Sequence, residues 1–226
     1  MEKIKAIIFD LDNTLIDFMK MKKEAIRSAV KAMIKTGLKI DESEGYDKLM
    51  KLYLKLGIES DNAFQKFLKN EIGRIDERML ASAINAYLKT KNSFMKPYPN
   101  VKPALSRLKK KGIKLAIVTD APKVKAYQRL LAMDIEKYFD FVIGFEDAGK
   151  KKTDLPFKMA IEKLKLKPEE IMVIGDSIKR DVIPARKSDM VAVLAKYGSQ
   201  EKIGKIKPDH EINDIKEVLS LVKQIV

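Results

Sequence analysis

The chain has 226 residues, of which 46% are apolar, and a formal net charge of +14. This length and apolar content predict a folded chain with one sizeable hydrophobic core and a smaller second unit, and they exclude a disordered chain. There is no cysteine and a single histidine, His210, which excludes disulfides, thiolate zinc sites and cysteine nucleophiles and leaves acid–base chemistry to carboxylates or lysines.

The positive charge raises the question of a nucleic-acid partner. Only seven of the 46 basic residues are arginine, and the lysines are spread along every predicted helix. We therefore expect a lysine-rich surface of the thermophile type and no specific nucleic-acid partner. No apolar run approaches the ~18 residues of a membrane span, and the first strand begins too early to leave room for a signal peptide. We expect a cytoplasmic protein with no membrane partner, either a monomer or a homodimer.

The first predicted element is a strand at residues 6–9, whose sequence Ala-Ile-Ile-Phe has no polar alternation. Such a strand is buried on both faces, as in a parallel sheet. It runs directly into two carboxylates, Asp10 and Asp12. Ligands of open α/β sheets bind outside the carboxyl ends of the strands, so we expect the chemistry here.

Residues 17–94 carry no strand pattern. Apolar residues recur there at helical spacing in four segments, at 19–36, 46–54, 64–68 and 79–88, and glycines follow the first two. These residues predict a separate helical domain. The segment Pro97-Tyr98-Pro99 predicts a stiff linker that leaves it.

Strands and helices alternate after the linker. The pattern predicts strands at 115–118, 141–143, 171–174, 191–194 and 210–212, with helices at 101–111, 124–131, 157–164 and 215–226. This alternation indicates an α/β fold, a Rossmann-like parallel sheet sandwiched by helices. The predicted domains are an α/β core of residues 1–16 and 95–226 and the inserted helical domain of residues 17–94.

Polar residues stand at the ends of three predicted strands: Asp10 and Asp12, then Thr119 and Asp120, then Asp176 followed by Asp181. Because parallel strands end at one edge of the sheet, these carboxylates would crowd one crevice, which requires a cation. Carboxylate oxygens without histidine or cysteine suit Mg²⁺, which usually serves a phosphate. The lysines at 150–152 could supply a matching positive charge.

A chemical role for the first pair follows from its spacing. Two residues along an extended strand return a side chain to the same face, so both acids could serve one substrate. One carboxylate could attack phosphorus and form an aspartyl-phosphate, while the other protonates the leaving oxygen and later deprotonates water.

Three segments resemble motifs of the haloacid dehalogenase-like hydrolases, in order and over the whole chain. They are Phe-Asp-Leu-Asp-Asn-Thr-Leu at 9–15, Val-Thr-Asp at 118–120 and Gly-Asp-Ser-Ile-Lys-Arg-Asp at 175–181. The helical insertion resembles the cap of members whose cap follows the first strand. The resemblance implies Asp10 as nucleophile and Asp12 as general acid–base. It implies Mg²⁺ ligands from the Asp10 carboxylate, the Asp12 main-chain oxygen and Asp176, with Asp181 beside the metal and Thr119 and Asp120 at the phosphate.

The third motif of that family departs from its usual form, a Lys-Pro pair shortly before a phenylalanine. Here residues 150–157 read Lys-Lys-Lys-Thr-Asp-Leu-Pro-Phe. Counting back from Phe157 without gaps gives Lys151 as the phosphate-binding lysine, and one deletion gives Lys152. We favour Lys151 and keep Lys152 as the alternative.

The second acid also separates reaction classes. Dehalogenases of this superfamily resemble one another in lacking an acid two residues after the nucleophile, so Asp12 favours phosphoryl chemistry. We expect a Mg²⁺-dependent phosphatase that hydrolyses a small phosphorylated metabolite through an aspartyl-phosphate. A phosphomutase of the same superfamily stays open. A phospho-accepting signalling module is the alternative from another class, although such modules lack an acid at the position of Asp12 and the helical insertion.

Overall fold

The computed structural model describes residues 3–151, 153–201 and 204–224. The chain divides into two compact units, Met1–Asp17 with Lys96–Val226, and Phe18–Met95. The boundaries expected from the sequence each differ from these by one residue. A role of the smaller unit as a cap stays a prediction.

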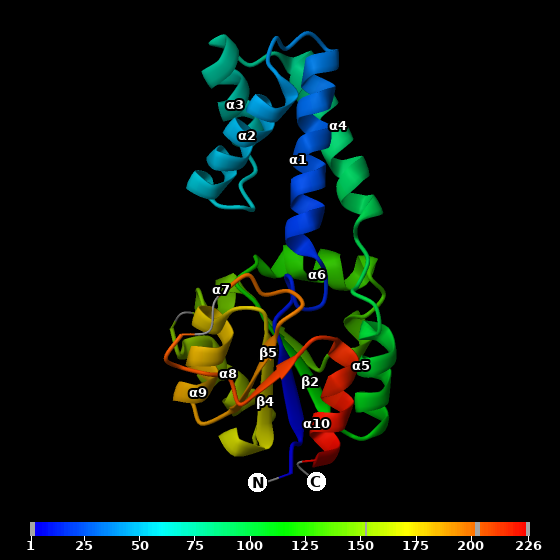
Figure 1. Cartoon of the computed structure of the whole chain (residues 1–226), viewed down its shortest axis with the longest axis vertical. Helices are drawn as coiled ribbons and strands as arrows, with labels where there is room; N and C mark the ends of the chain where they lie inside the picture. The colour runs from blue at the N-terminus through cyan, green and yellow to red at the C-terminus, as the bar shows by residue number, and fades with distance from the viewer. Residues whose placement is uncertain (1–2, 152, 202–203, 225–226) are drawn as a thin grey trace. The chain divides into compact units, whose positions relative to one another are not determined.

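The larger unit is built on one parallel sheet of six strands (Figure 1). Its order is β3-β2-β1-β4-β5-β6, which places β1 in the middle. The bounds are Ala6–Phe9 for β1, Lys114–Val118 for β2, Phe141–Ile143 for β3, Ile171–Gly175 for β4, Val191–Ala195 for β5 and His210–Ile212 for β6. The predicted α/β fold with a parallel sheet is therefore confirmed.

The register of the sheet explains why the polar strand ends meet. Phe9 of β1 pairs with Ile117 of β2 and with Ile174 of β4. The backbone N–H of Asp10 still donates to the Ile174 carbonyl, at 2.9 Å. The residues that follow β1, β2 and β4 thus leave the sheet side by side at its carboxyl edge.

Helices cover both faces of this sheet. Ile8 and Val173 share a buried cluster with Phe157 of α8 (Leu155–Leu164) and Ala185 of α9 (Ile183–Lys187). On the other side of the sheet lie α5 (Val101–Lys110) and α10 (Val218–Gln224) (Figure 1). Because β1 is fully buried from Ala6 to Phe9, its lack of polar alternation is accounted for. Two further helices, α6 (Lys123–Ala132) and α7 (Phe145–Ala148), follow β2 and β3.

The smaller unit contains four helices, one for each apolar stripe in the sequence. They are α1 (Phe18–Lys35), α2 (Glu42–Leu56), α3 (Ala63–Ile72) and α4 (Glu77–Ser93). Asp41 and Asp76 cap the N-termini of α2 and α4 by accepting backbone N–H bonds. The unit has its own buried cluster, in which Val30, Leu49 and Phe67 are fully covered. None of the helices in the described residues is long and apolar enough to cross a membrane.

Short elements are where the structure departs from the predicted pattern. The four-residue α7 and the segment between β4 and β5 were not predicted. That segment is a π-helical turn, Ile178–Val182, which continues into α9. The last helix begins as a 3₁₀ turn at Ile215–Glu217, and α8 begins two residues before its predicted start, with Pro156 in its first turn. Elements of one turn are too short to show a hydrophobic period.

Candidate active site

The chain turns sharply directly after β1. Asn13 adopts a left-handed conformation with a φ of 61°, which asparagine tolerates better than most residues. Its N–H donates to the Ile16 carbonyl at 2.7 Å. The turn therefore follows the two acids: β1 ends at Phe9, and Asp10 and Asp12 both precede Asn13. The hydroxyl of Thr14 in this turn donates to Asp10 Oδ2 at 3.3 Å.

A second loop, which follows β5 at the same carboxyl edge of the sheet, supports this turn. The Tyr197 hydroxyl, after β5, donates to the Thr14 carbonyl at 2.7 Å. The next residue, Gly198, lies so close to the turn that an added Cβ would meet the Asn13 carbonyl oxygen at 1.7 Å. Only glycine lets the two loops approach this closely.

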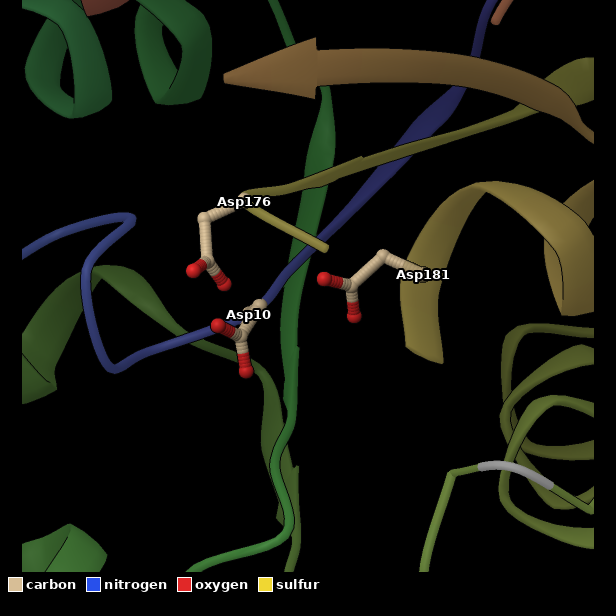
Figure 2. Close-up of side chains that lie close together, drawn as sticks. All are labelled: Asp10, Asp176 and Asp181. Carbon is tan, nitrogen blue, oxygen red and sulfur yellow. The ribbon is translucent and has the colours of Figure 1, made fainter. Parts of the chain in front are cut away.

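Three buried aspartates meet at the carboxyl edge of the sheet (Figure 2). Asp10 follows β1, Asp176 follows β4, and Asp181 comes from the π-helical turn. Each offers one carboxylate oxygen, and these oxygens lie within 4.8 Å of one another. Gly175 makes this possible, because an added Cβ would lie 2.2 Å from Asp181 Cγ.

Lys151 lies inside this acidic cluster. Its side chain is buried, and its Nζ lies 2.6 Å from Asp10 Oδ1 and 2.5 Å from Asp181 Oδ1. Burial alone would lower the pKa of Lys151, but the carboxylates of Asp10 and Asp181 hold it above its usual value. Its neighbour Lys150 is exposed, and Lys152 lies outside the described residues.

The residues after β2 form the next side of the site. Asp120 Oδ1 accepts the backbone N–H of Lys151 at 2.6 Å, which ties the two loops together. Thr119 is buried, and its Oγ1 accepts the backbone N–H of Ala121 at 3.2 Å. Arg180 reaches both acidic strand ends, with 3.7 Å to Asp120 Oδ2 and 3.7 Å to Asp176 Oδ1.

Asp12 lies in a different electrostatic environment from the cluster. Its Oδ2 is 3.3 Å from Nη1 of Arg129, a side chain on α6 that is 2% exposed. Burial raises the pKa of Asp12 to about 6, against the opposing charge of Arg129. A carboxyl group with a pKa near neutrality can both give and take a proton at physiological pH.

Two arginines of this site received no role from the sequence. Arg180 stands within the segment 175–181 that carries the acidic pair. Its place in the site could be predicted from the sequence, but its ion pairs with Asp120 and Asp176 could not. Arg129 stands beside Leu130 on the otherwise apolar stripe of α6, where a lone buried cation needs a partner. That isolated arginine was the one available signal.

The donor set fits a hard divalent cation. Burial, with Asp10 and Asp181 nearby, raises the pKa of Asp176 to about 8. Burial also raises the pKa of Asp181, although Lys151 opposes it. Asp176 Oδ1 is buried and accepts no hydrogen bond from any described residue. Lys151 and the more distant Arg180 do not balance the three carboxylates of the cluster and Asp120. Oxygen ligands of this kind suit Mg²⁺ or Ca²⁺.

Replacing Lys151 by alanine tests the electrostatic balance. The change leaves buried carboxylates without their cation, so we expect a loss of about 3 kcal/mol in unfolding free energy at pH 8 without metal. Denaturant titration in EDTA measures this loss. Lys150→Ala removes a neighbouring exposed lysine and should change stability by less than ~0.5 kcal/mol. Equal stability of the two variants would contradict the assignment of Lys151 as the balancing charge.

Known proteins resemble this chain over nearly its whole length. Residues 7–195 match the family model described as haloacid dehalogenase-like hydrolase. The chain is 33% identical over 224 residues to the glyceraldehyde 3-phosphate phosphatase of Methanocaldococcus jannaschii, covering 98% of both chains. It is 27% identical to the phosphoglycolate phosphatase of Aquifex aeolicus, covering 97% of both.

A solved structure shows the same fold. The haloacid dehalogenase-like phosphatase of Thermococcus onnurineus superposes with a TM-score of 0.70 at 24% identity, covering 97% of this chain and 98% of that one. The family model spans most of the sequence and includes the ends of β1, β2 and β4. The chain therefore belongs to the haloacid dehalogenase-like hydrolase family.

Proposed function

We propose that this protein is a Mg²⁺-dependent phosphatase that hydrolyses a small phosphorylated metabolite through an aspartyl-phosphate on Asp10. The observation that carries the proposal is the cluster of Asp10, Asp176 and Asp181 around Lys151. Asp12, whose pKa is raised to about 6 by burial, stands two residues from the proposed nucleophile. A dehalogenase would have no use for this acid, because a leaving halide needs no proton.

The proposed reaction has two halves. In the first, a carboxylate oxygen of Asp10 bonds to phosphorus while the bond from phosphorus to the leaving oxygen breaks. Asp12 gives its proton to that oxygen, which leaves as an alcohol. In the second half, water attacks phosphorus and gives a proton to Asp12. The acyl phosphate bond breaks, which releases phosphate and restores the Asp10 carboxylate.

The metal proposal uses the same residues. The Asp10 carboxylate, the Asp12 main-chain oxygen and Asp176 would hold Mg²⁺, with Asp181 beside it. When bound, Mg²⁺ reduces the repulsion between an anionic nucleophile and an anionic phosphate. We place Asp181 beside the metal and not among its ligands, because its carboxylate accepts the Ser177 N–H at 3.0 Å and contacts Lys151.

Phosphate recognition is assigned to the loops after β2 and β3. Lys151 supplies the buried charge, and Thr119 can donate its hydroxyl proton to a phosphate oxygen. Asp120 accepts the backbone N–H of Lys151, so part of its negative charge is used to hold that loop and does not face the phosphate. The alternative Lys152 lies outside the described residues, so the proposal rests on Lys151.

The substrate class rests on the relatives. A relative named as a glyceraldehyde 3-phosphate phosphatase makes that three-carbon phosphate the first substrate to assay. We assign the choice of substrate to the unit Phe18–Met95, acting as a cap domain. The proposal includes a cytoplasmic location and a soluble metabolite as the partner. Free phosphate release from glyceraldehyde 3-phosphate, phosphoglycolate, sugar phosphates and nucleoside monophosphates tests this class directly.

Paired substitutions separate the roles of the two acids. We expect Asp10→Asn to abolish phosphate release from glyceraldehyde 3-phosphate in the presence of Mg²⁺, because the amide is not a nucleophile. Asp12→Asn should lower kcat by about 10² to 10⁴ fold, the usual contribution of a general acid, while the fold is retained. Steady-state kinetics and circular dichroism measure both. Activity that survives Asp10→Asn would remove the nucleophile assignment.

Metal binding should be linked to pH. The pKa values of Asp12 and Asp176 are raised from 3.8 to about 6 and about 8, so their contribution to stability is present below about pH 4. It is lost as the pH rises through 6 and 8, because the buried carboxyls must then ionise. Mg²⁺ binds the ionised form, so it should raise the melting temperature more at pH 8 than at pH 5.

Thermal unfolding in EDTA and in excess Mg²⁺ at the two pH values measures this difference. Asp176→Asn should lose most of the Mg²⁺ effect and serves as the control. The same Mg²⁺ shift at both pH values would contradict the carboxylate site.

A further inference from the structure

A cavity lies in the larger unit, and none of its lining residues belongs to the aspartate cluster. Its volume is about 520 Å³, within the range of small-molecule sites. One wall comes from α9 and the other from the loop before β6. We call it the basic pocket, and its lining residues are Ile183, Arg186, Lys187, Lys205, Ile206, Lys207 and Pro208.

The basic pocket faces the opposite end of the sheet from the proposed active site. Helix α9 starts after the turn that carries Asp181 and runs back toward the amino end of β5. There the N–H of Asp209 donates to the Ala192 carbonyl, and the Ala192 N–H donates to Asp209 Oδ2, each at 2.8 Å. These bonds hold the loop before β6 beside the beginning of β5, whereas the aspartates lie at the carboxyl ends of the strands.

The charge of the basic pocket is not balanced by the protein. Arg186 is paired with Asp209. Lys187, Lys205 and Lys207 have no ion pair or hydrogen bond with any described residue. Three lysines converging on one cavity repel one another, so an anion with several charges would be attracted to it.

The rest of the lining is apolar. Ile206 is 42% exposed, and Ile183 and Pro208 line the same cavity. Exposed apolar side chains beside unpaired cations suit a ligand with an anionic part and a flat apolar part. Inorganic phosphate would use only the lysines and leave this wall uncovered.

We propose that the basic pocket binds a nucleoside polyphosphate. Its phosphates would lie on Lys187, Lys205 and Lys207, and its base would cover Ile206 and Pro208. The proposal is independent of the phosphatase assignment, because no residue of the aspartate cluster takes part. It also gives a role to three lysines that the proposed reaction does not use.

Calorimetric titration with ATP in EDTA, at about 0.15 M salt, tests the site on the full chain. We expect one site on the wild-type protein. Lys205→Gln combined with Lys207→Gln should weaken it about tenfold or more, because two charge-assisted contacts are lost. Lys66→Gln combined with Lys69→Gln removes the same charge from exposed positions on α3 and should change the affinity less than about twofold. Melting temperatures check that both double variants fold.

The outcomes separate the proposal from simple charge attraction. Equal weakening by both double variants, unchanged binding by the pocket variant, or no binding to the wild-type protein would overturn it. Inorganic tripolyphosphate is the second probe, and it should bind more weakly than ATP because it cannot cover the apolar wall. Tripolyphosphate binding as tight as that of ATP would overturn the nucleoside part of the proposal.

Discussion

Mutual repulsion of buried carboxylates is the constraint on which the rest of the active site depends. Asp10, Asp176 and Asp181 offer oxygens within 4.8 Å of one another, and all three side chains are buried. Such a group is stable only when positive charge lies beside it or when some of its carboxyl groups stay protonated. Lys151 provides part of that charge, and a divalent cation fits the remainder. A phosphate needs the same positive charge. The clustered carboxylates reduce the stability of the fold, but the cations that they require also prepare the site for an anionic substrate.

The fold holds these carboxylates together against their mutual repulsion. Pairing of β1 with β2 and β4 brings three chain segments to one edge of the sheet. Gly175 removes the side chain that would collide with Asp181, and the π-helical turn points Asp181 back at the strand end. Asp12, which directly precedes the turn at Asn13, lies outside the cluster and contacts Arg129 instead. Two acids two residues apart therefore have different surroundings, which suits one to bonding phosphorus and the other to moving protons.

The strands, the four helices of the inserted unit and the acidic strand ends were predictable because each depends on a pattern within a short window. The apolar run before Asp10 and the helical spacing in residues 18–95 are such patterns. Lys151 could be chosen over Lys152 only by a count from Phe157, because three adjacent lysines look alike in sequence. Arg129, the π-helical turn and the basic pocket depend on contacts between distant segments. The turn is shorter than any hydrophobic period, and the pocket joins α9 to residues 205–208, which no local pattern relates.

The proposed reaction requires Asp10 to carry the phosphoryl group during turnover. Acid quenching of the Asp12→Asn variant with glyceraldehyde 3-phosphate and Mg²⁺, followed by peptide mass spectrometry, tests it most directly. Without a carboxylate to accept a proton from the attacking water, hydrolysis should slow and the intermediate should accumulate. We expect one phosphoryl group on the peptide that contains Asp10, and none when Mg²⁺ is removed by EDTA. A phosphoryl group on another residue would contradict this role. So would phosphate release by the wild-type protein if neither the wild type nor the Asp12→Asn variant gives a phosphorylated peptide.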